Sequence, residues 1–193
     1  MASNKREQIL RAAGAVVMEW GAEKMTLDAV AEQAGVSKGG LLYHFPSKEA
    51  LIEAMVARLI EEFGAEVQNQ EQRLASQNVP AAGRWLRAYV TVGTTPEQDF
   101  DVMMAALLAA VTSNPALLGT MREADARWQN RAENDGIDPQ LATVIRLAAD
   151  GCWMSALFGF EAGFESEAKL RAVQKTLLRL IDRAIAESEE VEK

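Results

Sequence analysis

Signals that start helices recur along the whole chain and limit the folds it can adopt. A capping residue, a proline at the first helical position, or both occur repeatedly. They are Ser47-Lys48, Val79-Pro80, Thr95-Pro96, Asn114-Pro115, Asp138-Pro139 and Ser166-Glu167. Glycines between them, at positions 21, 35, 136 and 163, can take the positive φ that ends a helix. Because no strand-like alternation of apolar and polar residues appears, we predict an all-α fold of about nine helices.

Three short helices are predicted near the N-terminus. Apolar residues at helical spacing indicate an amphipathic first helix: Ile9, Ala13, Val16, Val17 and Trp20. Thr26 can cap a second helix, and a turn at Gly35-Val36 leads to a third that begins at Ser37. This third helix must end near Phe45, because Pro46 disfavours helical geometry in the residue before it. Two short helices joined by a glycine-containing turn are typical of a helix-turn-helix motif.

A longer fourth helix is predicted from Ser47 to about Glu71, with Leu51, Met55, Leu59 and Phe63 on one face. Further helices are expected at about 80–94, 96–112, 115–134, 139–162 and 167–188. We therefore divide the chain into an N-terminal helix-turn-helix module, residues 1–46, and a C-terminal helical domain, residues 47–193.

Composition excludes several classes of function. The longest uninterrupted apolar run, residues 102–111, is too short to span a membrane, and the N-terminus lacks an apolar secretory core. We expect a cytoplasmic protein with no membrane partner. A single cysteine, Cys152, and a single histidine, His44, exclude an intrachain disulfide and any metal site that needs two histidines or a cysteine cluster. Glycine-rich phosphate-binding motifs are also absent. We expect no metal, no cofactor and no enzymatic activity.

Charge is distributed unevenly along the chain. The formal net charge is −8, but residues 1–50 hold six basic and six acidic side chains, so the acidic excess lies in the remainder. The stretch from Val36 to Lys48 contains Lys38, Lys48 and His44 and no acid. This pattern predicts a small basic surface on an otherwise acidic protein.

The segment from Thr26 to Leu51, TLDAVAEQAGVSKGGLLYHFPSKEAL, closely resembles the DNA-binding module of the tetracycline-repressor (TetR) family of transcription regulators. The resemblance covers about residues 5–55 and combines the turn, the recognition helix, the proline and the following cap in one register. Many members of that family have tyrosine at position 42, whereas this chain has Leu42 followed by Tyr43. The resemblance implies a DNA-binding, dimeric, ligand-responsive regulator.

The residues of the third helix suit a major groove. A helix that reads base edges needs small or polar residues near its N-terminus, and this helix begins Ser37, Lys38, Gly39, Gly40. Each glycine costs about 1 kcal/mol of helix stability relative to alanine. Two adjacent glycines therefore favour close approach to another surface. Leu41 and Phe45, four residues apart, can anchor the helix to the module.

The resemblance implies specific contacts with DNA. Phosphate contacts are expected from Thr26, Ser37, Tyr43, His44 and Lys48, and base contacts from Lys38, Gly39, Gly40 and Tyr43. Competing interpretations remain for several of them. Thr26 can act only as a helix cap, and Tyr43 or His44 can pack in the module core.

Two C-terminal helices are predicted to form a subunit interface. One carries a stripe of small residues, Ala148, Cys152, Ser155 and Gly159. The last helix carries an apolar surface that includes Val173, Leu177, Leu180 and Ile181. Small residues permit close helix packing, so two such pairs can form a four-helix dimer interface. Burial of both stripes in the core of one chain is the alternative.

A ligand site is predicted where methionines and aromatic residues concentrate, since these side chains adapt to varied apolar molecules. The predicted lining is Phe63, Met104, Leu107, Met121, Trp128 and Trp153. A methionine-rich core is the alternative. Asp150 can counter a cationic ligand or form an ordinary ion pair.

The predicted function is a homodimeric regulator that binds a pseudo-palindromic DNA operator. We favour a repressor released by a small hydrophobic or amphipathic effector bound in the C-terminal domain. The alternatives are a ligand-dependent activator, a helical ligand-binding or partner-binding protein without DNA recognition, and a helical enzyme using carboxylates, lysine or tyrosine.

Overall fold

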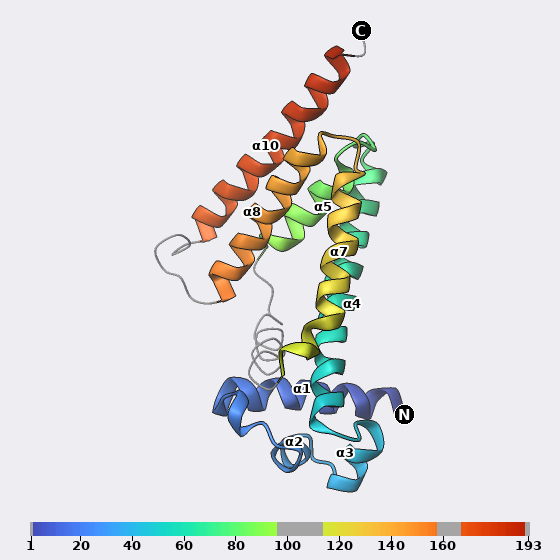
Figure 1. Cartoon of the computed structure of the whole chain (residues 1–193), viewed down its shortest axis with the longest axis vertical. Helices are drawn as coiled ribbons and strands as arrows, with labels where there is room; N and C mark the ends of the chain where they lie inside the picture. The colour runs from blue at the N-terminus through green and yellow to red at the C-terminus, as the bar shows by residue number, and fades with distance from the viewer. Residues whose placement is uncertain (1, 96–113, 158–166, 192–193) are drawn as a thin grey trace. The chain divides into compact units, whose positions relative to one another are not determined.

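A computed structural model of the chain describes residues 2–95, 114–157 and 167–191 (Figure 1). Within these ranges the ordered elements are α-helices and two short 3₁₀ helices, with no strand. The prediction of an all-α fold is confirmed. The helix predicted at 96–112, and the part of the 139–162 helix that follows Leu157, lie outside the described residues.

The helices follow the predicted order. They are α1 (Ala2–Trp20), α2 (Leu27–Gln33), α3 (Lys38–His44), α4 (Lys48–Ser76), α5 (Arg84–Gly93), α7 (Gly119–Glu133), α8 (Pro139–Leu157) and α10 (Glu167–Val191), with 3₁₀ helices at Ala22–Lys24 and Pro115–Leu118. Helix α4 continues to Ser76, beyond the expected end near Glu71. Helix α5 starts later than expected, because Gly83 before it has φ of +67° and cannot belong to a right-handed helix.

The chain divides into two compact units. Among the described residues, the first contains 2–61 and 114–124, and the second contains 62–95, 125–157 and 167–191. Helix α4 therefore contributes Lys48–Glu61 to the first unit and its remainder to the second. The two ends of this continuous helix thus pack in different units. The predicted functional boundary between residues 46 and 47 remains a prediction.

The first unit has its core between α1, α2, α3 and the start of α4. Fully buried side chains come from each of these helices: Ile9, Val16, Val30, Leu41 and Leu51. The turn between α2 and α3 is a Schellman motif, in which the N–H of Val36 donates to the carbonyl of Ala31 and that of Gly35 to Glu32. Gly35 has φ of +61°, as this turn requires. Trp20, predicted on the buried face, is exposed because it is the last residue of α1.

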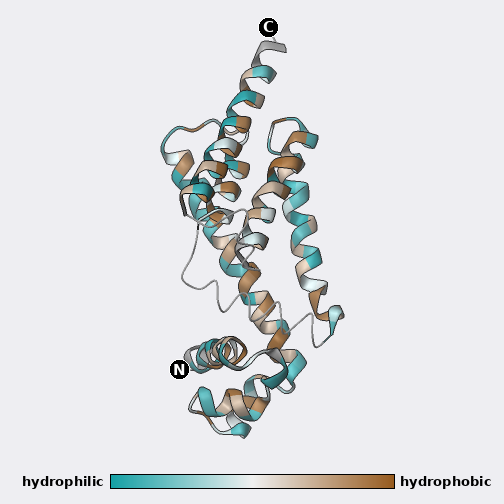
Figure 2. Ribbon diagram, turned by 90° about the vertical axis from the view of Figure 1, so that its left-hand side faces the viewer, coloured by the Kyte–Doolittle hydropathy of each residue, from teal (hydrophilic) through white to brown (hydrophobic). Residues whose placement is uncertain are grey.

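The second unit packs α5 against α8 and α10, which lie side by side in Figure 1. Leu86, Ile145 and Ile181 are fully buried in its core. Hydrophilic and hydrophobic residues occur on the same helices, as expected when one face of each helix packs and the other is exposed (Figure 2). Among the described helices, none combines the length and apolar character needed to cross a membrane.

The N-terminus of α5 is fixed by a residue distant in sequence. Asp135 accepts hydrogen bonds from the backbone N–H of Trp85 at 3.3 Å and of Leu86 at 2.8 Å. Its carbonyl also accepts from the N–H of Gly83. Gly83 has no side chain to cap the helix, so the Asp135 carboxylate performs that role.

Candidate nucleic-acid interface and effector site

The hydroxyl groups predicted to contact phosphates are helix caps. The Thr26 side chain accepts from Ala29 N at 3.1 Å, and the Ser37 side chain accepts from Gly40 N at 3.0 Å. Ser47 caps α4 in the same way, through Ala50 N. The capping interpretation is therefore confirmed. It does not conflict with a phosphate contact, because a hydroxyl oxygen that accepts one hydrogen bond can still donate its own proton.

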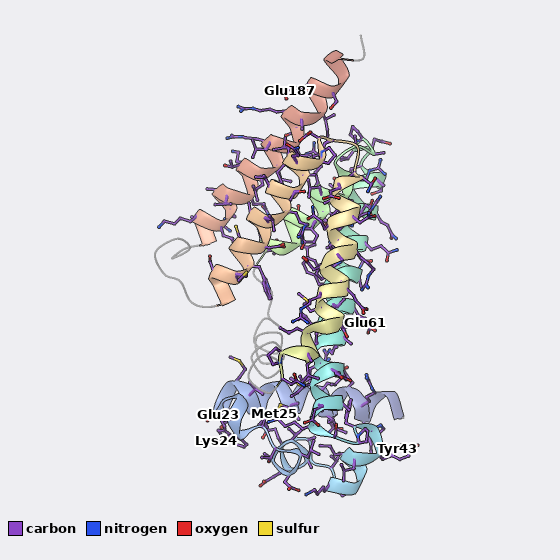
Figure 3. All side chains as sticks on the ribbon, viewed as in Figure 1. Glu23, Lys24, Met25, Tyr43, Glu61 and Glu187 are labelled. Carbon is purple, nitrogen blue, oxygen red and sulfur yellow. The ribbon has the colours of Figure 1, made fainter. Side chains whose placement is uncertain are left out.

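Helix α3 divides into anchors and exposed side chains. Leu41 and Phe45 are buried, as their spacing predicts. Tyr43 is 84% exposed and points away from the helix in Figure 3, so it is not a core aromatic residue. Its ring meets the ring of the half-buried His44 edge to face, at 5.2 Å between centroids. Apart from this ring contact, most of the Tyr43 side chain is accessible to another molecule.

The two glycines of α3 differ in their surroundings. A Cβ atom on Gly39 would have no atom of the protein within 4 Å, whereas one on Gly40 would lie 3.2 Å from Ser37 Oγ. Packing within the chain therefore gives no reason for the missing side chain at Gly39. This agrees with a surface that another molecule approaches closely.

Lys38 has a partner that sequence reasoning missed. Its ammonium Nζ lies 2.9 Å from Asp28 Oδ2 on α2. The two residues belong to different helices, so no spacing rule within one helix indicates the pair. Lys48, the other predicted lysine, is half-buried at the first turn of α4.

An aromatic cluster in the second unit joins residues from α4, α5 and α7. The Phe63 ring lies 5.0 Å from Trp128 and 5.2 Å from Tyr89. Trp85 lies 5.1 Å from Tyr89. The structure thus brings together Phe63 and Trp128, both predicted to line the ligand site. Trp85 and Tyr89 were not selected from the sequence, although their spacing of one helical turn places them on one face.

A polar network adjoins this cluster. The Tyr89 hydroxyl donates to Asp150 Oδ1 at 2.7 Å. Arg146 donates to Asp150 Oδ2 at 3.0 Å, to Asp125 Oδ1 at 2.8 Å and to Gln129 Oε1 at 2.7 Å. The Arg146 side chain is only 5% exposed. Asp150 therefore forms an ion pair within the chain, one of the two roles considered for it.

Burial and charge shift the titration of this network. Desolvation raises the pKa of the Asp150 carboxyl, while the Tyr89 hydrogen bond and the Arg146 charge oppose the shift. Desolvation, followed by the Asp150 charge, raises the pKa of Tyr89 far above its usual range. Tyr89 therefore stays a neutral hydrogen-bond donor at physiological pH.

The other predicted ligand residues are less closely associated. Met104 and Leu107 lie outside the described residues. Met121 is half-buried and belongs to the first unit, whereas the aromatic cluster belongs to the second. Trp153 is half-buried on α8. Their part in a ligand site stays a prediction.

The predicted interface residues fall on different sides of their helices. Cys152, Leu177 and Ile181 are buried in the core of the chain, which leaves them little surface for a second copy. The half-buried residues are Ala148, Ser155, Val173 and Leu180, and Gly159 lies outside the described residues. Among the side chains of α8 that the structure describes, the large exposed apolar ones are Val144, Leu147 and Met154, at 59%, 54% and 49% exposure. The predicted small-residue stripe of α8 therefore lies on a face that is partly buried within the chain, and its part in a subunit interface stays a prediction.

Comparisons with known proteins cover both parts of the chain. Residues 9–55 match the family described as "Bacterial regulatory proteins, tetR family", and residues 83–182 match "Tetracyclin repressor-like, C-terminal domain". The HTH-type transcriptional regulator BetI of Serratia proteamaculans is 32% identical over 168 residues, which are 80% of this chain and 82% of BetI.

Two further similarities support only part of this assignment, the first because it is short and the second because it shows the fold alone. The HTH-type transcriptional regulator RutR of Escherichia coli K12 is 44% identical over 59 residues, 31% of this chain and 28% of RutR. The multidrug binding protein EbrR, solved with malachite green, has the same fold at a TM-score of 0.64 and 23% identity, over 91% of this chain and 96% of EbrR. With a DNA-binding helix-turn-helix module followed by a C-terminal domain of the matching family, the chain belongs to the TetR family of transcriptional regulators.

Proposed function

We propose that this regulator is a homodimeric repressor that binds a pseudo-palindromic operator and is released by a small hydrophobic or amphipathic effector. The observation that carries the proposal is that α3 has one set of buried anchoring residues and another set of exposed residues. Leu41 and Phe45 anchor the helix, while the exposed Tyr43 and the unobstructed Gly39 face away from the module's packing. The protein acts by binding rather than by catalysis, in the cytoplasm where its DNA lies.

In this proposal α3 enters the major groove, as the second helix of a helix-turn-helix motif does. Lys38, Gly39, Gly40 and Tyr43 approach base edges. The phosphate contacts come from the side chains of Thr26, Ser37, Tyr43, His44 and Lys48. The glycines let the helix backbone come close to the bases, and the exposed tyrosine offers both an aromatic face and a hydroxyl.

The dimer interface is proposed on α8 and α10. Val144, Leu147 and Met154 are large exposed apolar side chains along α8, here called its exposed apolar stripe. Exposed apolar side chains that gather on one helix can mark an interaction site. The half-buried Ala148 and Ser155 border the stripe, and Val173 and Leu180 contribute from α10. Two copies related by a two-fold axis present two recognition helices to half-sites about 34–36 Å apart, or a multiple of that distance.

The effector site is proposed at the aromatic cluster of Phe63, Trp85, Tyr89 and Trp128. Its rings can stack on a flat apolar molecule, and Asp150 lies beside them through Tyr89. EbrR was solved with malachite green, an aromatic cation, and we extend that ligand class to this chain as the first to screen. Helices α4 and α7 both continue from this unit into the other. A ligand that displaces Phe63 or Trp128 therefore acts on helices that reach the DNA-binding unit, and it shifts the population between binding-competent and released forms.

The test is selection of bound duplexes from a random DNA library by the purified protein, with its size measured in parallel. Recovery of one inverted repeat by a dimer supports the proposal and supplies the operator. Addition of triarylmethane dyes to the complex then tests release. Failure to enrich any sequence, with or without a cell metabolite extract, would contradict operator recognition. Transcription from the recovered operator, measured with and without the protein, distinguishes repression from activation.

A further inference from the structure

An acidic side chain lies within the proposed DNA-binding surface. Asp28 is the second residue of α2 and follows the Thr26 cap closely. Its carboxylate Oδ2 lies 2.9 Å from Lys38 Nζ, at the first residue of α3. The side chains are 69% and 57% exposed, so the pair is formed in contact with solvent. The charge of the lysine expected to approach DNA is therefore already matched by a carboxylate.

This arrangement has a cost for DNA binding. Phosphate neutralisation by lysine supplies most of the affinity that proteins have for DNA of any sequence. A carboxylate in the same surface repels phosphates, and it competes with them for the ammonium group. Lysine is also a compact charge on a flexible stem, so without a partner it can turn to any nearby phosphate. In the structure, the ion pair with Asp28 instead places the Lys38 ammonium beside α2.

We propose that Asp28 is a positioning residue that increases sequence specificity, by holding the Lys38 ammonium at the start of α3 and keeping it from phosphates on unrelated DNA. The proposal rests on the proposed DNA-binding surface of α2 and α3. In a complex with the operator, the tethered ammonium donates to base acceptors in the major groove, and its partner offsets the charge that would otherwise favour any duplex. Asp28 thus lowers non-specific affinity more than operator affinity.

The central variant is Asp28→Asn, which keeps the size of the side chain and removes its charge. Affinity for an unrelated duplex is expected to rise about two- to fivefold, the range for loss of an exposed ion pair. The slope of log affinity against log salt concentration is expected to steepen by about 0.9 for each lysine that gains a phosphate. Operator affinity is expected to change less, so the ratio of operator to unrelated affinity falls.

The experiment measures binding of the full-length protein to its selected operator and to an unrelated duplex, by fluorescence anisotropy at several salt concentrations. Glu32→Gln is the matched control, because it removes the same charge from an exposed position of the same helix. Asp28→Glu tests rescue by a restored carboxylate. Asp28→Asn is also combined with Lys38→Met, since an effect that acts through Lys38 must vanish when Lys38 is replaced. Melting temperatures confirm that each variant is folded.

The proposal predicts lower specificity for Asp28→Asn, recovery with Asp28→Glu, little change with Glu32→Gln, and no added effect of Asp28→Asn in the Lys38→Met protein. Equal changes in Asp28→Asn and Glu32→Gln would overturn it, because net charge alone would then explain them. Persistence of the effect without Lys38 would overturn it as well. A wild-type protein with no preference for any duplex would instead contradict the proposed DNA-binding surface itself.

Discussion

At the scale of single residues, the side chains of α3 are either buried in the core of the helix-turn-helix module or exposed on its surface. Leu41 and Phe45 are buried, while Tyr43 is almost fully exposed. Gly39 has an open position where a side chain would stand. If the proposed contacts are correct, stability and DNA affinity depend on different residues of this short helix, and we expect substitutions to separate the two properties.

Gly39→Ala is expected to stabilise the module and to weaken operator binding. Alanine favours a helix over glycine by up to about 1 kcal/mol, and no atom of the protein obstructs the new methyl group. The same methyl group would stand where we propose that the helix backbone approaches the bases, and we expect about a tenfold loss of operator affinity. Urea unfolding and fluorescence anisotropy measure the two effects. Unchanged operator affinity would show that Gly39 does not approach DNA.

Tyr43→Ala and Phe45→Ala are expected to separate binding from folding. Loss of the exposed Tyr43 should alter the free energy of unfolding by no more than about 0.5 kcal/mol, yet reduce operator affinity about tenfold or more. Loss of the buried Phe45 should cost about 3–5 kcal/mol of stability. Thermal unfolding by circular dichroism, with anisotropy on the same samples, tests both. A Tyr43→Ala protein that binds the operator like the wild type would contradict our assignment.

Residue roles within one helix could be predicted from the sequence, because Leu41 and Phe45 follow helical spacing. Contacts between helices could not. The Asp28–Lys38 pair and the Arg146 network join residues on different helices, and their partners depend on how those helices pack. On α8 the sequence showed which residues share a face, but not which face packs against the rest of the chain. The stripe predicted for the dimer interface therefore includes Cys152, which is buried.

At the scale of helices, α5 depends on a cap supplied from the turn between α7 and α8. Asp135 accepts from two backbone N–H groups of α5 with its two oxygens. Burial raises the pKa of this carboxyl from its ordinary value of 3.8, while the two backbone hydrogen bonds oppose the shift. Asp135 thus fixes the first turn of α5 although its own desolvation is unfavourable.

Asp135→Asn is expected to destabilise the protein by about 1–3 kcal/mol, because asparagine has only one oxygen and leaves one buried N–H without an acceptor. The cost should depend on pH. The folded protein binds a proton at a higher pH than the unfolded chain, so the charged carboxylate reduces stability above the folded pKa. This reduction disappears as pH falls through the folded pKa towards 3.8.

Urea unfolding of the wild type and of Asp135→Asn between pH 7 and pH 4 tests this expectation. The stability advantage of the wild type should increase as pH falls across that window. An advantage that shrinks would mean that the folded state favours the ionised form. Equal stability of the two proteins would show that the carboxylate does not cap α5.

Helix bounds were predictable where the signals are local, as at Thr26, Ser37 and Pro46. The start of α5 was not, because its cap lies far away in sequence and Gly83 gives no side-chain signal. Helix α4 extends to Ser76 past its expected end, since a polar sequence without glycine or proline does not itself end a helix.

At the scale of the whole molecule, the proposed binding to a pseudo-palindromic operator requires two copies of the chain. The exposed apolar stripe of Val144, Leu147 and Met154 is the surface proposed to join them. The all-α fold and its family were predictable from helix signals and from the motif of residues 26–51. The sequence did not predict that α4 belongs to two compact units. A continuous helix has no local sequence signal at the residue where the helices packed against it change.

Leu147→Arg is expected to weaken dimerisation about tenfold or more without unfolding the chain, because the side chain is exposed in the single copy and its replacement buries charge at the interface. Ala126→Arg, at an exposed position of α7, is the control. Sedimentation velocity over a range of concentrations measures the dissociation constant. A Leu147→Arg protein as dimeric as the control would place the subunit interface elsewhere.

In the proposed complex, two recognition helices held by one dimer read two half-sites at a fixed separation. The most direct test of this arrangement is the affinity of the full-length protein for its selected operator after about 5 or about 10 base pairs are inserted between the half-sites, a half turn or a full turn of DNA. We expect both insertions to reduce affinity at least about tenfold, because the dimer cannot engage both half-sites at once. Affinity that is unchanged by either insertion would contradict the account.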